Sequence, residues 1–150
     1  MIRRALIALP IAAVVFGGTA LAIPSLHDYN GHVKGDPGSA VAFNLDRSGS
    51  RPRVFNIDAS GLAFDCEAGS PGETEAVFFD GVFRVHRDRT FGGPSDVTIG
   101  NTDPPGRFEG RLKSGGRAAG TLRIHGELDP EGQPGVDCKT GELRWKAEKN

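Results

Sequence analysis

The chain has 150 residues, of which 25% are charged and 37% are hydrophobic, and its formal net charge at pH 7 is −1. This length suits a single domain. The balanced charge argues against nucleic acid or an anionic membrane surface as a main partner.

Residues 1–22 have the pattern of a secretory signal peptide. Two arginines precede an apolar run over residues 5–16, and the sequence Ala-Leu-Ala closes the segment. A basic start, a short apolar core and small residues at the end predict cleavage after Ala22. The alternative is an uncleaved membrane anchor, since residues 5–23 are nearly long enough to span a bilayer. The Ala-Leu-Ala site favours cleavage.

Cleavage would leave residues 23–150 as one secreted domain. It removes two arginines and no acidic residue, so the net charge becomes −3. We expect a secreted or cell-envelope-associated protein, with membrane contact only if the leader is retained.

Apolar and polar residues alternate along the mature chain, which indicates strands with one buried face. The alternating sets are, in chain order, Val41, Phe43, Leu45; Phe55, Ile57; Leu62, Phe64, Cys66; Val77, Phe79; Phe83, Val85; Val97, Ile99; Phe108, Leu112; Leu122, Ile124, Leu128; and Leu143, Trp145, Ala147. Glycine- and proline-rich turns separate them. The pattern predicts an all-β fold, either an antiparallel β-sandwich or a small β-barrel of about nine strands.

Two hairpins are predicted from the turn residues. Asp80-Gly81, a strong tight-turn pair, separates the apolar runs 77–79 and 83–85. The clearest hairpin joins residues 107–113 to residues 117–127.

The only tryptophan, Trp145, lies on the predicted last strand, residues 142–148, between Leu143 and Ala147. Gly110, Gly120 and Gly126 on the preceding hairpin mark bulges or places where a bulky partner crosses closely. We therefore expect the Trp145 ring to pack over these glycines in the core. The alternative is a tryptophan displayed for ligand stacking.

The mature chain has two cysteines, Cys66 and Cys138. In an exported protein such a pair is usually oxidised, so we predict one structural disulfide. Free thiols and redox chemistry are the alternatives. No C-x-x-C spacing is present, and no metal site is predicted.

Most of the mature chain resembles a type of small secreted bacterial all-β domain of unknown function. The resemblance rests on Tyr29-Asn30-Gly31, the mid-chain Cys66, the hairpin segment 117–121, and the closing run Cys138-Lys139-Thr140-Gly141-Glu142-Leu143-Arg144-Trp145. It implies export and an all-β fold, and it carries no activity.

No catalytic site is predicted. Of the four histidines, His86 and His125 follow apolar strand positions and should face solvent, and no serine lies in a Gly-x-Ser-x-Gly motif. Glu109 and Glu127 are the strongest candidates for a carboxylate pair assembled from different strands, as glycoside hydrolysis requires. Both lie on the outward face of the predicted hairpin. We expect neither an enzyme nor a cofactor.

One binding patch is predicted, formed by Arg84, His86, Arg87 and Arg89 between Phe83 and Phe91. An anionic glycan or envelope polymer could dock there. The alternative is a solvated strand face that keeps an edge soluble. Elsewhere the basic residues are spread along the sequence.

We therefore expect a secreted, non-catalytic β-domain that binds an extracellular or cell-envelope partner. One alternative is a small β-barrel that carries an apolar ligand. A weaker one is a hydrolase with carboxylates from different strands. A large apolar internal cavity would favour the carrier, and a filled core would favour the binding domain.

Cleavage of the leader gives the first testable prediction. N-terminal sequencing of protein recovered from the culture medium should begin at Ile23, because the Ala-Leu-Ala site directs cleavage after Ala22. Intact Met1 in a membrane fraction would contradict this and favour the uncleaved anchor.

Overall fold

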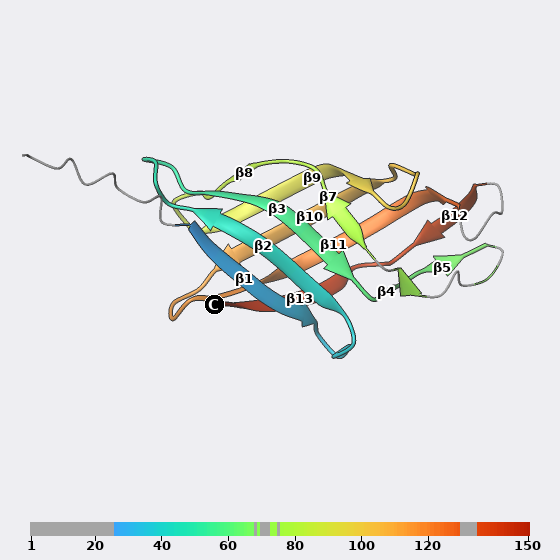
Figure 1. The fold of residues 1–150 in the computed structure, drawn as a ribbon, viewed down its shortest axis with the longest axis horizontal. Helices are drawn as coiled ribbons and strands as arrows, with labels where there is room; N and C mark the ends of the chain where they lie inside the picture. The colour runs from blue at the N-terminus through green and yellow to red at the C-terminus, as the bar shows by residue number, and fades with distance from the viewer. Residues whose placement is uncertain (1–25, 68, 70–72, 75, 130–134) are drawn as a thin grey trace, which may run out of the picture.

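The computed structural model describes residues 26–67, 69, 73–74, 76–129 and 135–150 (Figure 1). The predicted leader, residues 1–22, lies outside them. Among the described residues there is no helix long and apolar enough to cross a membrane.

The regular elements of the described chain are strands, which confirms the all-β prediction. Their bounds are β1 Leu26–Val33, β2 Ala40–Asp46, β3 Arg53–Ser60, β4 Leu62–Ala63, β5 Asp65–Cys66, β6 Glu73–Thr74, β7 Val77–Phe79, β8 Phe83–Arg84, β9 Thr90–Thr98, β10 Pro105–Leu112, β11 Arg117–Leu128, β12 Val136–Lys139 and β13 Leu143–Lys149.

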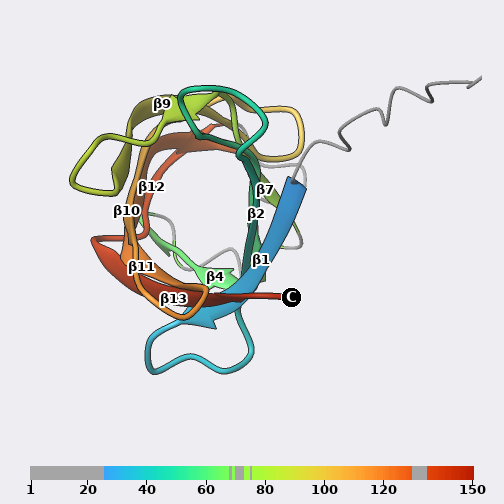
Figure 2. The same cartoon turned by 90° about the vertical axis from the view of Figure 1, so that its left-hand side faces the viewer.

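Eight of these strands form a closed antiparallel barrel. Around the barrel the order is β10-β9-β7-β3-β2-β1-β13-β11, and β11 pairs with β10 to close the ring. Figure 2 looks along the barrel and shows the closed wall. Of the two architectures left open by the alternation, the chain therefore adopts the barrel. The predicted hairpin of residues 107–113 and 117–127 is confirmed as β10 and β11.

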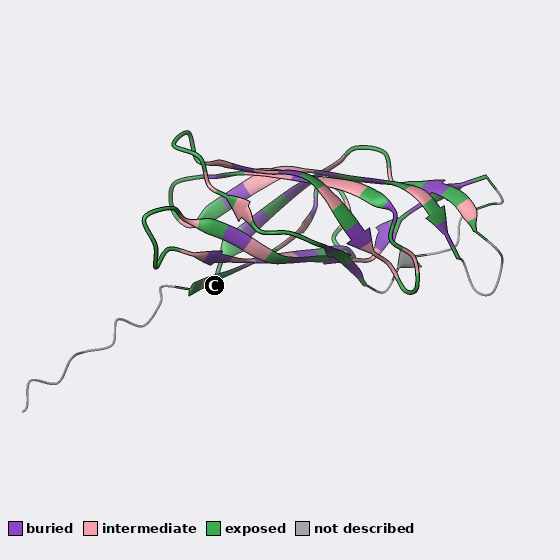
Figure 3. Cartoon of the chain, turned by 90° about the horizontal axis from the view of Figure 1, so that it is seen from above, coloured by how far each residue is buried: buried purple, intermediate pink, exposed green. Residues whose placement is uncertain are grey.

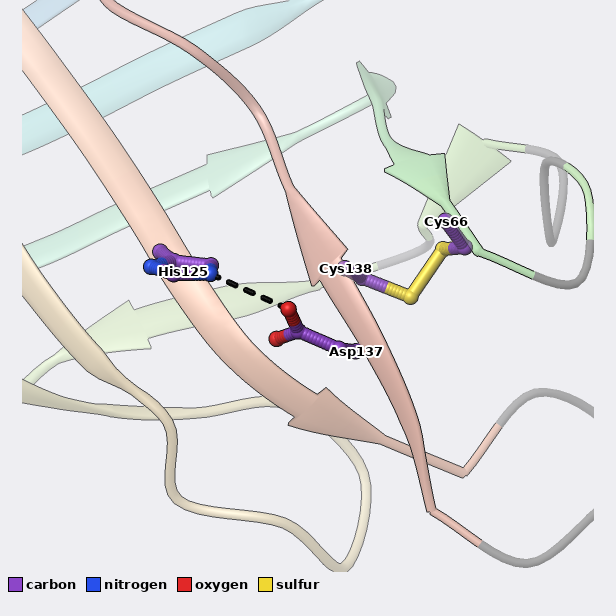
Figure 4. Close-up of a disulfide and its surroundings, with 4 residues drawn as sticks. All are labelled: Cys66, His125, Asp137 and Cys138. Atoms are coloured by element: carbon purple, nitrogen blue, oxygen red, sulfur yellow. Dashed lines mark hydrogen bonds and ion pairs between the residues drawn. A yellow bond between two sulfur atoms is a disulfide. The ribbon is translucent and has the colours of Figure 1, made fainter.

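A short extension projects from one end of the barrel, on the right in Figure 1. The last four residues of β11, His125–Leu128, pair with β12, and β12 pairs with β5. In that second pairing Cys138 lies directly opposite Cys66, and the two form a disulfide with a Cα–Cα distance of 4.1 Å (Figure 4). The predicted disulfide is confirmed. It joins two segments 72 residues apart in the chain.

The tight turn predicted at Asp80-Gly81 is wrong. Strands β7 and β8 do not pair with each other, but lie one after the other along β3. The cause is a bulge in β3 at Asn56, which has a φ of 49° and coincides with a register shift against β2. A bulge locally disrupts pairing. The segment 80–82 therefore continues past the bulge instead of reversing the chain.

The barrel interior is filled by aromatic side chains, and buried and exposed residues alternate along the strands (Figure 3). The ring of Phe43 on β2 lies 6.3 Å from that of Phe108 on β10, four strands away around the barrel, so the rings meet from opposite walls. The buried aromatic residues are Tyr29, Phe43, Phe64, Phe79, Phe91, Phe108 and Trp145. Small closed barrels are generally filled in this way.

Trp145 is a core residue, as expected from its spacing, with 2% of its surface exposed. Its ring stacks on Phe108 at 4.9 Å and crosses the cross-strand pair Gly110 and Gly120. A Cβ atom on Gly110 would lie 2.6 Å from Cζ of Phe91 and 2.7 Å from Cζ2 of the indole, both closer than van der Waals contact allows. The indole N–H has no hydrogen-bond partner among the described residues, so packing holds the ring. Gly126 lies apart from this contact, against Pro104.

We predict that Gly110→Ala lowers the free energy of unfolding by about 1–3 kcal/mol, because the added methyl group overpacks the core. In a Trp145→Phe background the same change should cost less, since phenylalanine lacks the clashing Cζ2 and Cη2 atoms of the indole and only the contact with Cζ of Phe91 remains. Urea unfolding of the four proteins in this double-mutant cycle measures the coupling. Gly49→Ala is the matched control, because a Cβ there meets nothing nearer than 4.0 Å. Equal costs in both backgrounds would contradict the packing described.

The disulfide should stabilise the protein without building the barrel. We expect no titratable thiol under denaturing, non-reducing conditions, and a loss of about 2–5 kcal/mol in the free energy of unfolding for the double variant Cys66→Ala/Cys138→Ala. Because the bridge lies outside the barrel, the native double variant should keep blue-shifted Trp145 fluorescence that iodide quenches poorly. Water-like fluorescence would show that the bridge is needed for barrel closure.

Candidate functional site

Three connections of the barrel and the end of β13 lie at one end. Strands β1, β3, β9 and β11 begin there, and β2, β10 and β13 end there. The loops 47–52, 85–89 and 113–116 and the end of β13 therefore lie around one opening, which faces the viewer in Figure 2.

Basic side chains gather around this opening, and we call this region of the molecule, with these side chains, the basic end. They are Arg47, Arg51, Arg53, Arg84, Arg87, Arg89, Arg111, Lys113, Arg117 and Lys149, all of them exposed. The acidic side chains at this level of the barrel are Asp28, Asp46, Asp88 and Glu148. Ion pairs join Arg53 to Asp46 at 3.3 Å and Arg111 to Asp88 at 3.9 Å. The other eight cations of the basic end make no ion pair within the described chain.

Repulsion between like charges at the basic end destabilises the folded protein. Arg53 on β3 lies directly opposite Arg84 on β8, and like charges in opposed positions are destabilising. Burial, together with the positive charges of Lys149 and Arg47, lowers the pKa of His27. The end thus presents positive potential that its own carboxylates only partly offset.

The four residues of the predicted patch, Arg84, His86, Arg87 and Arg89, are all exposed at this end. They lie on β8 and in the turn that follows it. The His86 amide donates a hydrogen bond to the Thr90 carbonyl at 2.8 Å, and the Arg89 amide donates one to the His86 carbonyl at 2.9 Å. The Asp88 carboxylate accepts hydrogen bonds from the amide (3.1 Å) and the hydroxyl (2.6 Å) of Thr90. These hydrogen bonds define the backbone of the turn, from which the exposed side chains of Arg87 and Arg89 extend.

Arg89 has a φ of 69°, in the left-handed region where a non-glycine residue is disfavoured. Glycine or asparagine would be accommodated there at lower cost. Backbone strain of this kind concentrates at functional sites. An arginine at this position is consistent with a role for its charge.

The phenylalanines expected to flank the patch are not displayed. Phe91 is 3% exposed and belongs to the core, and Phe83 is half-buried against it. Strand alternation explains this, since Phe91 points inward from β9.

The expectation that basic residues are spread also needs correction. They are spread along the sequence, but barrel closure brings ten of them to one end.

An open groove extends the basic end along the outside of β1, β13 and β11. Its volume is about 630 Å³, and its charged lining includes Lys113, Arg117, Lys146 and Lys149, with Glu148 as the acidic side chain. Lys149 and Arg117 lie on neighbouring strands, where Arg117 pairs with Glu148. A long anionic chain could thus run from the 85–89 turn across the rim into this groove.

The other end of the molecule has the opposite charge. Around it, and on the disulfide-linked extension, lie the exposed acids Asp65, Glu67, Asp103, Glu127, Asp129, Asp137 and Glu142. The described basic residues there are Lys34, Arg107, Arg123, Lys139 and Arg144. The molecule is therefore polarised along the barrel axis, although its net charge is close to zero.

His125, predicted to face solvent, is exposed and lies 3.2 Å from Asp137 beside the disulfide (Figure 4). Both side chains are about half-exposed or more, and neither cysteine is free. Within the described ranges, no group of three His, Cys, Asp or Glu side chains is close enough to hold a metal ion.

The carboxylates Glu109 and Glu127 are not brought together. Glu109 lies opposite Thr121, which is six residues from Glu127 along β11. At about 3.4 Å per residue this separates them by roughly 20 Å, well beyond the spacing that glycoside hydrolysis uses. Glu109 is instead paired with Arg107 at 2.6 Å, and that hydrogen bond lowers the pKa of the Glu109 carboxyl.

No protein-family model, curated protein or solved structure matches this chain. The basic end and the filled core are the features of the molecule that bear on its function.

Proposed function

We propose that this protein is a secreted, non-catalytic module that holds an anionic polymer of the cell envelope or the extracellular space at its basic end. The observation that carries the proposal is the gathering of ten exposed cations at one end, eight of them without an ion pair among the described residues. A charged surface of one sign attracts and orients a polyanion. The adjoining groove gives such a chain a path along the barrel.

Three further features support this proposal. The disulfide is compatible with an oxidising compartment outside the cytosol. The aromatic rings that meet across the barrel leave the interior to side chains, which favours a surface-binding module over a carrier of an apolar ligand. The separation of Glu109 and Glu127 removes the carboxylate pair on which the hydrolase alternative rested.

The affinity should depend on salt, because binding a polyanion releases its counterions. We predict that labelled polyglycerol phosphate binds the mature protein at low salt and that the triple variant Arg84→Gln/Arg87→Gln/Arg89→Asn binds it at least about tenfold more weakly. Three exposed charge contacts of about 0.5 kcal/mol each account for that factor. Fluorescence anisotropy over a range of salt concentrations measures both the affinity and its salt dependence.

The matched control is Arg123→Gln/Lys139→Gln/Arg144→Gln, which removes the same charge away from the basic end and should keep most of the affinity.

Arg89→Asn alone should weaken binding while leaving the melting temperature unchanged or higher, since asparagine tolerates the left-handed backbone. Equal losses in the two triple variants would refute a localised site. Tighter binding of duplex DNA than of the polymer would assign the end to nucleic acid instead.

A further inference from the structure

The wall of the barrel is interrupted beside the bulge in β3. β3 pairs with β7 through Ile57–Ala59 and with β8 through Arg53 and Val54, and the segment 80–82 passes between these pairings. In the described chain, the amides of Gly81 and Val82 donate no hydrogen bond. The bulge also turns two consecutive residues, Phe55 and Asn56, away from the core.

Apolar side chains are exposed at this interruption. Phe78 is 51% exposed and Val82 is 61% exposed. Among the described residues one other large hydrophobic side chain is exposed to this extent, that of Leu26 on β1, and it lies elsewhere. Phe78 and Val82 line, together with Phe55, an open groove of about 420 Å³, a volume within the range of ligand pockets. Grouped apolar exposure of this kind marks interaction sites.

The charged side chains that line the groove are both acidic. They are Asp58, directly opposite Phe78 on the neighbouring strand, and Asp80. Neither forms an ion pair with any described residue. Burial raises the pKa of the Asp58 carboxyl against the opposing effect of a hydrogen bond to its own backbone, and its charged form lacks the compensation of a paired cation within the described chain. A cation placed beside Asp58 would supply it.

We propose that this groove, which we call the β3–β7 groove, binds a peptide segment of another protein in which a lysine or arginine stands next to an apolar side chain. The apolar side chain would lie between Phe78 and Val82, the cation would pair with Asp58 and Asp80, and the unused amides of the 80–82 segment would bond the peptide backbone. Recognition through main-chain hydrogen bonds at an open sheet position, with pockets for side chains, is a recurring mode of peptide binding. The groove selects the opposite charge to the basic end, so this inference does not depend on the proposed function.

The test uses a fluorescein-labelled peptide with a central lysine between two leucines and flanking glycines. It should bind the mature protein and shift the amide NMR signals of Gly81 and Val82. Replacing its lysine by glutamate, or its leucines by serines, should weaken binding at least about tenfold. Binding of the glutamate peptide as tight as that of the lysine peptide would overturn the proposal.

Protein variants locate the site. Asp58→Asn and Phe78→Ser should each weaken binding about tenfold, and Val82→Ser serves if Phe78→Ser alters the fold. Leu26→Ser and Glu127→Gln are the controls, an exposed apolar residue and an exposed acid outside the groove, and both should leave affinity unchanged. Equal binding by all the variants would overturn the proposal. So would a dimer of the wild-type protein that Phe78→Ser abolishes in sedimentation, because it would assign the groove to a second copy of the chain.

Discussion

The packing of Trp145 against two glycines is the contact on which the barrel depends. Gly120 has Gly110 as its partner on one side and Trp145 on the other, so the indole crosses the seam where β10, β11 and β13 meet. The ring stacks on Phe108 and contacts Phe43 and Phe91, which come from other parts of the wall. One large side chain on the last strand thereby joins the closing seam to the rest of the core.

Barrel closure has an electrostatic consequence that the composition hides. Because antiparallel strands start and stop at alternate ends, loops far apart in the chain meet around the same opening. Arg47, Arg87 and Lys113 come from three such loops, and closure places them on one rim. The acids gather at the other end and on the extension. A chain of nearly zero net charge can therefore carry a strongly basic surface, and average charge is a poor guide to its partners.

The core and the surface have separate tasks in this molecule. The buried aromatic rings and the disulfide account for stability, and none of the residues that we assign to binding belongs to either. The two proposed surfaces also differ in chemistry, since the basic end suits a polyanion and the β3–β7 groove suits a cationic peptide. Substitutions on the outer surface should alter binding with little effect on folding, which makes both proposals accessible to mutagenesis.

Local patterns were sufficient for much of this structure. Alternation identified the strands, and the spacing of Leu143, Trp145 and Ala147 identified the inward face of β13. Two cysteines in a chain predicted to be exported implied the bridge. Each of these inferences depends on neighbouring residues or on composition alone. The closed barrel, the basic end and the β3–β7 groove were decided only in three dimensions. Closure depends on how eight strands share one core. The alternation of apolar residues gives no sign of the bulge at Asn56, beside which β7 and β8 lie one after the other along β3. The positions of Arg47 and Lys113 likewise follow from which strand ends meet, a property of the whole ring and not of any segment.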